Sequence, residues 1–236
     1  MSKLITKTNL PFATYFITGT DTDVGKTICT KALLQAANKQ SLRTLAYKPI
    51  AAGCEDTNEG LRNQDALILQ QHSSITVDYD NVNPIAFKEP IAPHIAALKT
   101  QQVISIDTIN KGLATLQIEQ PQLLLVEGAG GWHLPINDQQ LLSEWVVEKQ
   151  LPVILVVGLK LGCLNHALLT AQTIQQSGLY IAGWIANHLQ PDMPYVQDNI
   201  STLKSLIKAP LLAEIPFLKD IGEQELSSYI AVKFSS

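Results

Sequence analysis

The chain has 236 residues, of which 46% are hydrophobic, so it is long enough to bury the core of one large domain. Seventeen basic and 21 acidic residues give a net charge of -4, and no stretch concentrates lysine or arginine, which argues against a nucleic-acid or anionic-membrane partner. The three cysteines lie far apart without a C-x-x-C pair, which argues against a disulfide framework or a zinc site and favours a reducing compartment.

The start of the chain lacks the apolar core and cleavage site of a signal peptide. The longest apolar run, residues 151–159, contains a proline and is far shorter than the roughly 20 residues of a membrane helix. We therefore expect a cytoplasmic protein, without a membrane partner, that folds as a single domain over residues 1–236.

Short apolar runs alternate with longer segments of helical period along the chain, a pattern typical of a parallel α/β sheet. Strands are expected at 13–18, 42–47, 123–126, 153–157, 181–186 and 211–215, helices at 25–40, 164–176 and 195–207, and an irregular proline-rich loop at 81–93. The continuous apolar runs LLLV and VILVV suit strands that are buried on both faces. The sequence predicts a single doubly wound α/β domain with a mostly parallel sheet, in which ligands bind beyond the carboxyl ends of the strands.

Residues 19–27, GTDTDVGKT, stand between the first expected strand and the first expected helix. They end like the phosphate-binding pattern G-x-x-x-x-G-K-[ST], although Gly19 comes one residue early. Unpaired N–H groups at a helix N-terminus bind phosphate, Lys26 adds a full charge, and the hydroxyl of Thr27 suits Mg²⁺. This context predicts a nucleotide site of the P-loop NTPase type; a glycine turn with a solvated Lys26 is the plainer alternative.

Two aspartates lie in this loop, Asp21 and Asp23, and both would repel a phosphate that they faced. We therefore expect them to face away from it. A second substrate, the water shell of a metal ion or a cationic group are the contacts that remain open for them.

Three more polar side chains come at or near the expected strand ends. Lys48 follows the second strand, and Glu127 follows the strand LLLV in the glycine-rich run EGAGG, as a Walker-B acid does. Asp65 lies near the start of a short helix, where capping is the alternative role. Thr27, Asp65 and Glu127 together would offer three oxygens to Mg²⁺. The alternative for Lys48 is an ordinary surface lysine, and the alternative for Glu127 is a solvated glutamate at the end of a strand.

Weaker candidates follow. His94 either touches substrate or starts a helix, and Asn187 ends a strand, where its amide either reads a base edge or forms a turn. Cys163 has no basic neighbour in the sequence to make it a thiolate, so we interpret it as structural.

Several longer motifs occur in an order and spacing similar to those of dethiobiotin synthetase, the ATP-dependent cyclising carboxylase of biotin synthesis. The similarity extends from about residue 13 to 216 and is carried by GTDTDVGKT, AYKPIAAG, LRNQDALIL, EPIAPHIAA, LLLVEGAGGW, LPVILVVGLKLGCLNHALLTAQ and GWIAN. The resemblance implies a homodimer that uses 7,8-diaminononanoate, CO2 and ATP and produces dethiobiotin, ADP and phosphate. It also implies a route through a carbamate and a carbamic–phosphoric anhydride, with Mg²⁺ as the cofactor.

The resemblance assigns roles to residues at matching positions. Lys48 and Lys26 are implied to be catalytic, and Thr27, Asp65 and Glu127 to hold the metal. The implied ATP contacts are Asp23, Val24, Gly25, Lys26, Thr27, Ile28, Asp65, Glu127, Gly128, Ala129, Gly130, Asn187, His188, Pro216, Phe217 and Leu218. The implied substrate contacts are Lys48, Ala52, Gly162, Cys163, Leu164 and Asn165, the last four reaching across from a second subunit.

One position departs from the family pattern. The family often has serine where this chain has Ala52, and alanine cannot donate the hydrogen bond that the serine makes on the diamine side. The sequence beyond Leu218 matches poorly, so no contacts are assigned there.

Two other classes of protein share a phosphate-binding loop. Partitioning-type ATPases, which act as nucleotide switches, carry a second lysine five residues before the GKT lysine, where this chain has Asp21. A regulatory nucleotide-binding module would have no use for the combination of Lys48, Asp65 and Glu127. Both alternatives are therefore disfavoured by the residues present.

Overall fold

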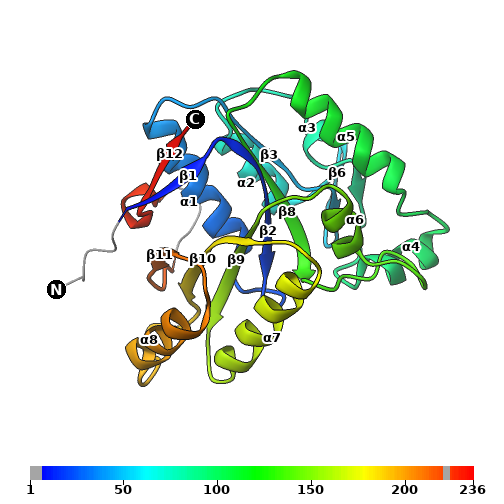
Figure 1. Cartoon of the computed structure of the whole chain (residues 1–236). Coiled ribbons are helices and arrows are strands. Elements are labelled where there is room, and N and C mark those ends of the chain that lie inside the picture. Colours follow the sequence, from blue (N-terminus) through cyan, green and yellow to red (C-terminus); the bar gives the residue numbers. More distant parts are fainter. Residues whose placement is uncertain (1–6, 220–223) are drawn as a thin grey trace.

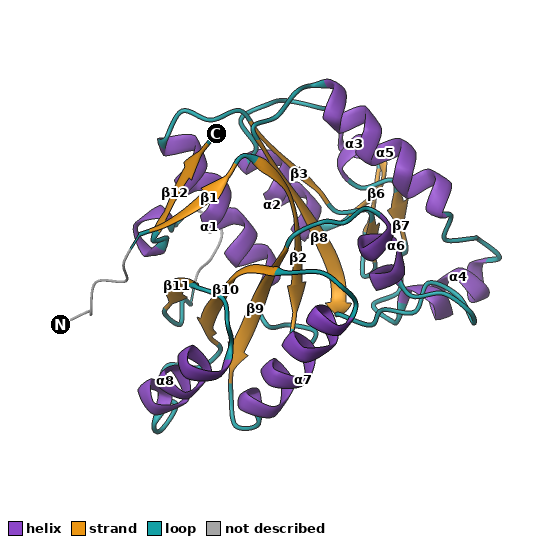
Figure 2. Cartoon of the chain, viewed as in Figure 1, coloured by secondary structure: helices purple, strands orange, loops and turns teal. Residues whose placement is uncertain are grey.

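The computed structural model describes residues 7–219 and 224–236, and a six-stranded parallel sheet forms the centre of that part of the chain (Figures 1 and 2). The strand order is β11-β10-β9-β2-β8-β3. The strands are β2 (Ala13–Gly19), β3 (Thr44–Tyr47), β8 (Leu123–Gly131), β9 (Val153–Leu159), β10 (Ile181–His188) and β11 (Leu211–Ile215). All their pairings are parallel, so their carboxyl ends meet at one edge of the sheet.

Helices cover both faces of this sheet, which makes it doubly wound as predicted (Figure 1). They are α1 (Lys26–Lys39), α2 (Gln64–His72), α3 (Tyr79–Val82), α4 (Pro93–Thr100), α5 (Ile106–Ile118), α6 (Leu142–Glu148), α7 (Cys163–Gln176) and α8 (Val196–Leu206). None of the described helices is both long enough and apolar enough to cross a bilayer.

The strands bury alternate side chains in two separate cores. In β8, Leu123 and Leu125 pack on the face covered by α1, whereas Leu124 and Val126 pack on the face covered by α5, α6, α7 and α8. Side chains of successive strand residues point to opposite faces, so an uninterrupted apolar run is what such a strand requires. This alternation is the physical reason why LLLV could be recognised as a buried strand.

Smaller sheets flank the central one. β4 (Ile50–Ala51) pairs in parallel with β7 (Ile85–Ala86), and β5 (Glu55–Thr57) pairs with β6 (Gly60–Arg62) as an antiparallel hairpin. These elements follow β3 along the chain, and β6 and β7 lie to the side of the central sheet, beyond its β3 edge (Figure 2).

A two-stranded parallel ribbon joins distant parts of the chain. β1 (Thr8–Pro11) pairs with β12 (Val232–Ser235), which follows the short 3-10 turn η1 (Ser227–Tyr229). Leu10, Val232 and Phe234 belong to the same buried cluster as the inner side of α1. The ribbon therefore packs against the helix that follows the predicted phosphate loop.

The predicted strands and helices are all present, with ends that differ by a few residues. Two expectations need correction. β8 extends to Gly131, so Glu127 lies inside the strand and not after it, because the glycines of EGAGG continue the pairing as far as Gly19. The loop expected at 81–93 contains the end of α3 and all of β7, and it ends at the first residue of α4.

Candidate active site

The phosphate loop (residues 19–27) connects β2 to α1. Gly25 is the N-cap of α1 and has a φ of 85°, a left-handed conformation that favours glycine. A Cβ atom on Gly25 would lie 2.1 Å from Nδ2 of Asn187, and that amide donates a hydrogen bond of 2.9 Å to the carbonyl of Val24. Asn187, at the end of β10, thus holds the loop in place through this hydrogen bond. The first N–H groups of α1 have no partner within the helix and remain available for an anion.

Lys26 and Asp21 have separate surroundings within this loop. Nζ of Lys26 donates to the carbonyl oxygen of Asp21 at 3.2 Å, and burial lowers the pKa of this lysine. The carboxylate of Asp21 points elsewhere and forms an ion pair of 2.8 Å with Lys160. The hydrogen bond from Lys160 lowers the pKa of Asp21. Of the contacts left open for Asp21, the structure therefore supports the cationic group.

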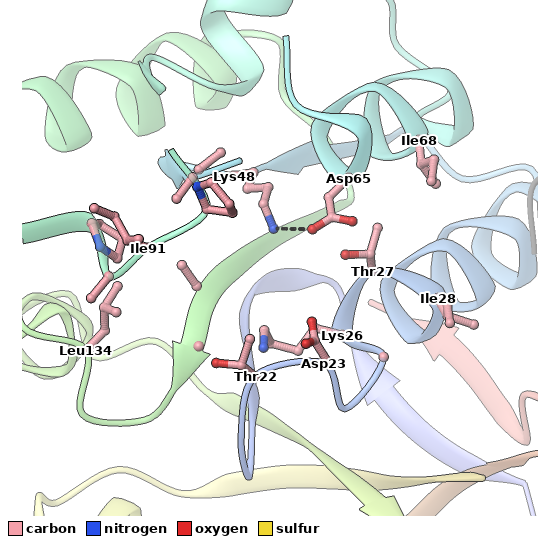
Figure 3. Close-up of a pocket in the computed structure, with 18 residues that line it drawn as sticks. Thr22, Asp23, Lys26, Thr27, Ile28, Lys48, Asp65, Ile68, Ile91 and Leu134 are labelled. Atoms are coloured by element: carbon pink, nitrogen blue, oxygen red, sulfur yellow. Dashed lines mark hydrogen bonds and ion pairs between the residues drawn. The ribbon is translucent and has the colours of Figure 1, made fainter. Parts of the chain in front are cut away.

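Four polar side chains from four segments converge beside the loop. Nζ of Lys48 lies 2.6 Å from Oε1 of Glu127 and 3.1 Å from Oδ2 of Asp65. The hydroxyl of Thr27 donates to the same Oε1 atom at 2.8 Å. Lys48 follows β3, Glu127 lies in β8, Asp65 lies in the first turn of α2, and Thr27 lies in the first turn of α1. The ammonium of Lys48 points at the carboxylate of Asp65 (Figure 3).

Burial makes these charges interdependent. Glu127 is 0% exposed and Lys48 is 4% exposed. Burial alone would lower the pKa of Lys48, but the charges of Glu127 and Asp65 outweigh burial and raise it, so the ammonium form is strongly favoured. Burial would likewise raise the pKa of Asp65, and the charge and hydrogen bond of Lys48 lower it instead. The N-cap of α2 is the side chain of Asn63, so Asp65 is not the cap.

A second hydroxyl holds the other oxygen of the buried glutamate. Oγ1 of Thr30, one turn after Lys26 in α1, lies 3.0 Å from Oε2 of Glu127 and 2.8 Å from the carbonyl oxygen of Lys26. Sequence reasoning overlooked Thr30, because it stands outside the G-K-T pattern and a helical threonine is by itself unremarkable.

A pocket of about 760 Å³ opens beside this cluster (Figure 3). Polar side chains line its middle, with Ile28 and Ile68 at one end and Ile91 and Leu134 at the other (Figure 3). The predicted residues that line it are Asp23, Gly25, Lys26, Thr27, Ile28, Lys48, Ala52, Asp65, Ala129 and Gly130. Thr22, Ala51, Ile68, Pro90, Ile91, Ala92, Pro93 and Leu134 complete the lining, and sequence reasoning did not single them out. The proline-rich composition of residues 90–93 was the available signal for part of this lining.

Three predicted nucleotide contacts support the pocket from behind without lining it. Val24 is fully buried in the core on the α1 side. A Cβ atom on Gly128 would lie 2.8 Å from Cζ of Phe16, so this glycine permits close packing. Glu127 is fully buried, and its carboxylate reaches the site through hydrogen bonds from Thr27 and Lys48.

The residues expected to contact adenine lie at the ends of β10 and β11. Asn187 is 3% exposed, and its amide holds the phosphate loop, a role that the sequence did not suggest. Nε2 of His188 lies 3.0 Å from Oε1 of Glu214. Three further residues follow β11 and do not line the pocket: Pro216, Phe217 and Leu218.

The residues expected to bind the substrate from a second subunit lie at the start of α7. Gly162, with a φ of 93°, is its N-cap, and Cys163 is buried as a free thiol. Neither these two residues nor Leu164 and Asn165 line the pocket of their own chain. His94, the second residue of α4, does not line it either.

The donor set fits a magnesium ion. Thr27, Asp65 and Glu127 supply one hydroxyl and two carboxylates, the hard oxygen ligands that Mg²⁺ takes. The ammonium of Lys48 already lies between the two carboxylates, which shows that this point attracts a cation. Among the described residues, no group of three or more His, Cys, Asp or Glu side chains could hold a metal ion. A metal here would accordingly depend on the hydroxyl and on the ligand phosphates.

Comparison with known proteins finds relatives that match nearly the whole chain. The family model described as "AAA domain" matches residues 13–225. The ATP-dependent dethiobiotin synthetase BioD of Vibrio parahaemolyticus is 51% identical over 219 residues, which cover 93% of this chain and 96% of that protein. The ATP-dependent dethiobiotin synthetase BioD 1 of Escherichia coli K12 is 52% identical over 209 residues, 89% of this chain and 92% of that one.

Solved structures of more distant proteins share the fold. The MinC:MinD cell division complex of Aquifex aeolicus contains a chain with a TM-score of 0.58 and 16% identity, with 92% of each chain covered. A ParA family ATPase of Chlorobium tepidum has a TM-score of 0.56 and 14% identity, with 93% of this chain and 97% of that one covered. At such low identity these likenesses show the P-loop NTPase type of fold and nothing more. The sequence identities of about one half, over nearly the whole length, decide the family: the chain belongs to the ATP-dependent dethiobiotin synthetases.

Proposed function

We propose that the chain carboxylates 7,8-diaminononanoate with CO2 and closes the ureido ring of dethiobiotin, with conversion of ATP to ADP and phosphate. The observation that carries this proposal is the position of Lys48. Its buried ammonium lies between two carboxylates beside the phosphate loop and borders a pocket that has both polar and apolar side chains in its lining. A site that only held a nucleotide would not need this second cationic side chain beside Lys26.

The phosphate loop would bind the ATP phosphates. Gly25 allows them to approach the backbone, the N–H groups at the start of α1 donate to them, and Lys26 adds a full charge. Among residues 7–219 and 224–236 its ammonium donates only to a carbonyl oxygen, so it can turn to a phosphate without breaking an ion pair with any of them. These groups stabilise the charge that develops on the transferred phosphoryl group.

Thr27, Asp65 and Glu127 would hold Mg²⁺, which when bound neutralises charge on the phosphate oxygens. Lys48 contacts Oε1 of Glu127 most closely, and it also lines the pocket. Its ammonium would yield this oxygen to the cation and balance the negative charge of a substrate carbamate in the pocket. Lys48 is therefore proposed as the catalytic lysine.

The apolar side chains that line the pocket suit the alkyl chain of the diamine. Ile91 and Leu134 lie together at one end of the pocket (Figure 3), and Ala52 also lines it. Asp23 lines the pocket near Lys26, where its carboxylate suits an amine (Figure 3). A substrate amine first captures CO2, and the carbamate oxygen then attacks the γ-phosphorus, which releases ADP. The second amine attacks the carbonyl carbon of the anhydride, and phosphate leaves. Because both amines belong to one bound molecule, the ring closure is intramolecular.

The far end of the substrate would be bound by Gly162, Cys163, Leu164 and Asn165 of a second subunit in a homodimer. This part of the proposal is supported by the exposure of Gly162 and Asn165 at the start of α7 and by the absence of all four residues from the lining of their own pocket; the thiol of Cys163 is itself buried. The next residue back, Leu161, is 97% exposed. We place the reaction in the cytoplasm, which agrees with the three free thiols.

Asp21 disfavours the switch-type ATPase. At the position where that class has its second lysine, the structure has a carboxylate that is paired with Lys160. A carboxylate cannot stabilise the phosphates of a partner subunit.

The test is ATP hydrolysis measured with and without the diamine and bicarbonate, with dethiobiotin followed by mass spectrometry. We expect hydrolysis to require both, and Lys48→Ala to form no product while it still binds ADP. Hydrolysis that is indifferent to the diamine, or an active Lys48→Ala variant, would contradict the proposed function.

A further inference from the structure

Thr30 is a buried hydroxyl that faces the site from behind. It is 0% exposed and does not line the pocket, so no ligand in the pocket can touch it. It lies in α1 one turn after Lys26, and its Oγ1 atom reaches Oε2 of Glu127 at 3.0 Å. Its contact with the site is therefore made through the carboxylate of Glu127.

The two oxygens of Glu127 have different partners. Oε1 faces the site and accepts hydrogen bonds from Thr27 and Lys48. Oε2 faces away from them and accepts from Thr30. The terminal torsion of a glutamate has a broad, shallow minimum, so the carboxylate of an isolated glutamate rotates easily. A donor on each oxygen restricts this rotation.

The single proton of the Thr30 hydroxyl has two possible acceptors. The carbonyl oxygen of Lys26, at 2.8 Å, is the alternative. A helix carbonyl at this position accepts the backbone N–H four residues later in any case, whereas an ionised carboxylate can only accept and is costly to bury with an unpaired oxygen. A hydrogen bond from Thr30 to Glu127 is therefore more stabilising than one from Thr30 to the carbonyl oxygen of Lys26.

We propose that Thr30 is a positioning residue for Glu127, whose orientation it fixes so that Oε1 is presented to Lys48 or to a divalent cation. This inference rests on the proposed function in so far as it takes Glu127 to be a ligand of that cation. Without the hydroxyl, Oε2 has lost this donor and the carboxylate turns, so that Oε1 leaves the point where the other oxygens converge.

The experiment compares Thr30→Val, which keeps the shape of the side chain without the hydroxyl, with Thr30→Ser, which keeps the hydroxyl. Binding of Mn²⁺ in the presence of ADP is measured by electron paramagnetic resonance. We expect Thr30→Val to bind Mn²⁺ about ten- to a hundredfold more weakly, the worth of one hydrogen bond to a charged group, and Thr30→Ser to stay within about threefold of the original chain. ADP binding in the presence of a chelator should be unchanged in both.

Thr44→Val is the matched control. Thr44 is also fully buried, and its hydroxyl donates to Oδ1 of Asn38 at 2.7 Å. This variant loses a buried hydrogen bond at the opposite end of β3 from Lys48, so its Mn²⁺ affinity should stay that of the original chain while its stability falls.

Two results would overturn the assignment. The first is that Thr30→Val binds Mn²⁺ as tightly as the original chain does. The second is that Thr30→Ser and Thr30→Val bind Mn²⁺ equally weakly, because the shape of the side chain and not its hydroxyl would then be responsible. If Thr30→Val does not fold, Thr30→Ala against Thr30→Ser makes the same comparison. A chain that makes no dethiobiotin but shows the expected Mn²⁺ pattern would contradict the proposed function and leave the role of Thr30 standing.

Discussion

Replacement of Lys48 by methionine should destabilise the metal-free protein strongly. Methionine keeps the unbranched shape but removes the ammonium that lies 2.6 Å from Glu127, which is 0% exposed. Removal of one partner of a buried ion pair costs about 3–5 kcal/mol, because the other charge stays buried. Asp65 adds little, because its side chain is 48% exposed and water can solvate it. For a chain of this size the loss lowers the melting temperature by about 6–20 °C.

The assay is thermal unfolding followed by circular dichroism, with and without Mg²⁺ and ADP. Bound Mg²⁺ supplies the missing positive charge, so the two ligands together should raise the melting temperature of Lys48→Met more than that of the original chain. The double variant Lys48→Met/Glu127→Gln has no buried charge to compensate and should recover much of the loss. An unchanged melting temperature in Lys48→Met, or a double variant less stable than the single one, would refute this reasoning.

Three further substitutions probe other parts of the site. Gly25→Ala should lower the free energy of unfolding by about 2–3 kcal/mol, because alanine is strained in the left-handed conformation and its Cβ would displace the Asn187 amide 2.1 Å away. The affinity for ADP should fall as well. A urea titration measures the stability and calorimetry the affinity, and values equal to those of the original chain would refute the clash. Thr27→Val should lower Mg²⁺-dependent turnover roughly tenfold, because it loses a metal oxygen and the hydrogen bond to Glu127; unchanged kinetics would remove Thr27 from the metal site. The pKa of Glu214 is lowered, first by the hydrogen bond with its histidine neighbour, so its contribution to stability is complete above pH 4.5 and is lost as the pH falls through its lower folded value. Glu214→Gln should therefore show a shallower loss of stability below pH 4.5 in urea titrations, and an identical pH dependence would contradict this.

The sheet and the phosphate loop could be predicted from the sequence because their signals are local. A strand buried on both faces needs an uninterrupted apolar run, and the start of α1 needs Gly25 in a left-handed conformation. β1 and β12 gave no such signal, since each is only four residues long and the partner lies more than two hundred positions away.

The site was predictable only as a set of residue types. Lys48, Asp65 and Glu127 could be expected at one edge of the sheet, because parallel strands end there together. That Lys48 lies between the two carboxylates depends on burial and on distances that no spacing in the sequence encodes. Thr30 and Asn187 show the same limit, because each acts through a contact with a residue about a hundred or more positions away.

The pairing of β1 with β12 has a consequence for how the protein is made. Thr8 pairs with Val232, so this ribbon closes a loop that encloses the whole central sheet. Contacts between residues so far apart in sequence form late, because the entropy of closing a long loop must first be overcome. During translation β1 has to wait, with its edge unpaired, until β12 has been synthesised. The ribbon covers the back of α1 only after β12 has been synthesised. A chain on a stalled ribosome would therefore contain the whole phosphate loop, while α1, which follows the loop, would still lack its contacts with the ribbon.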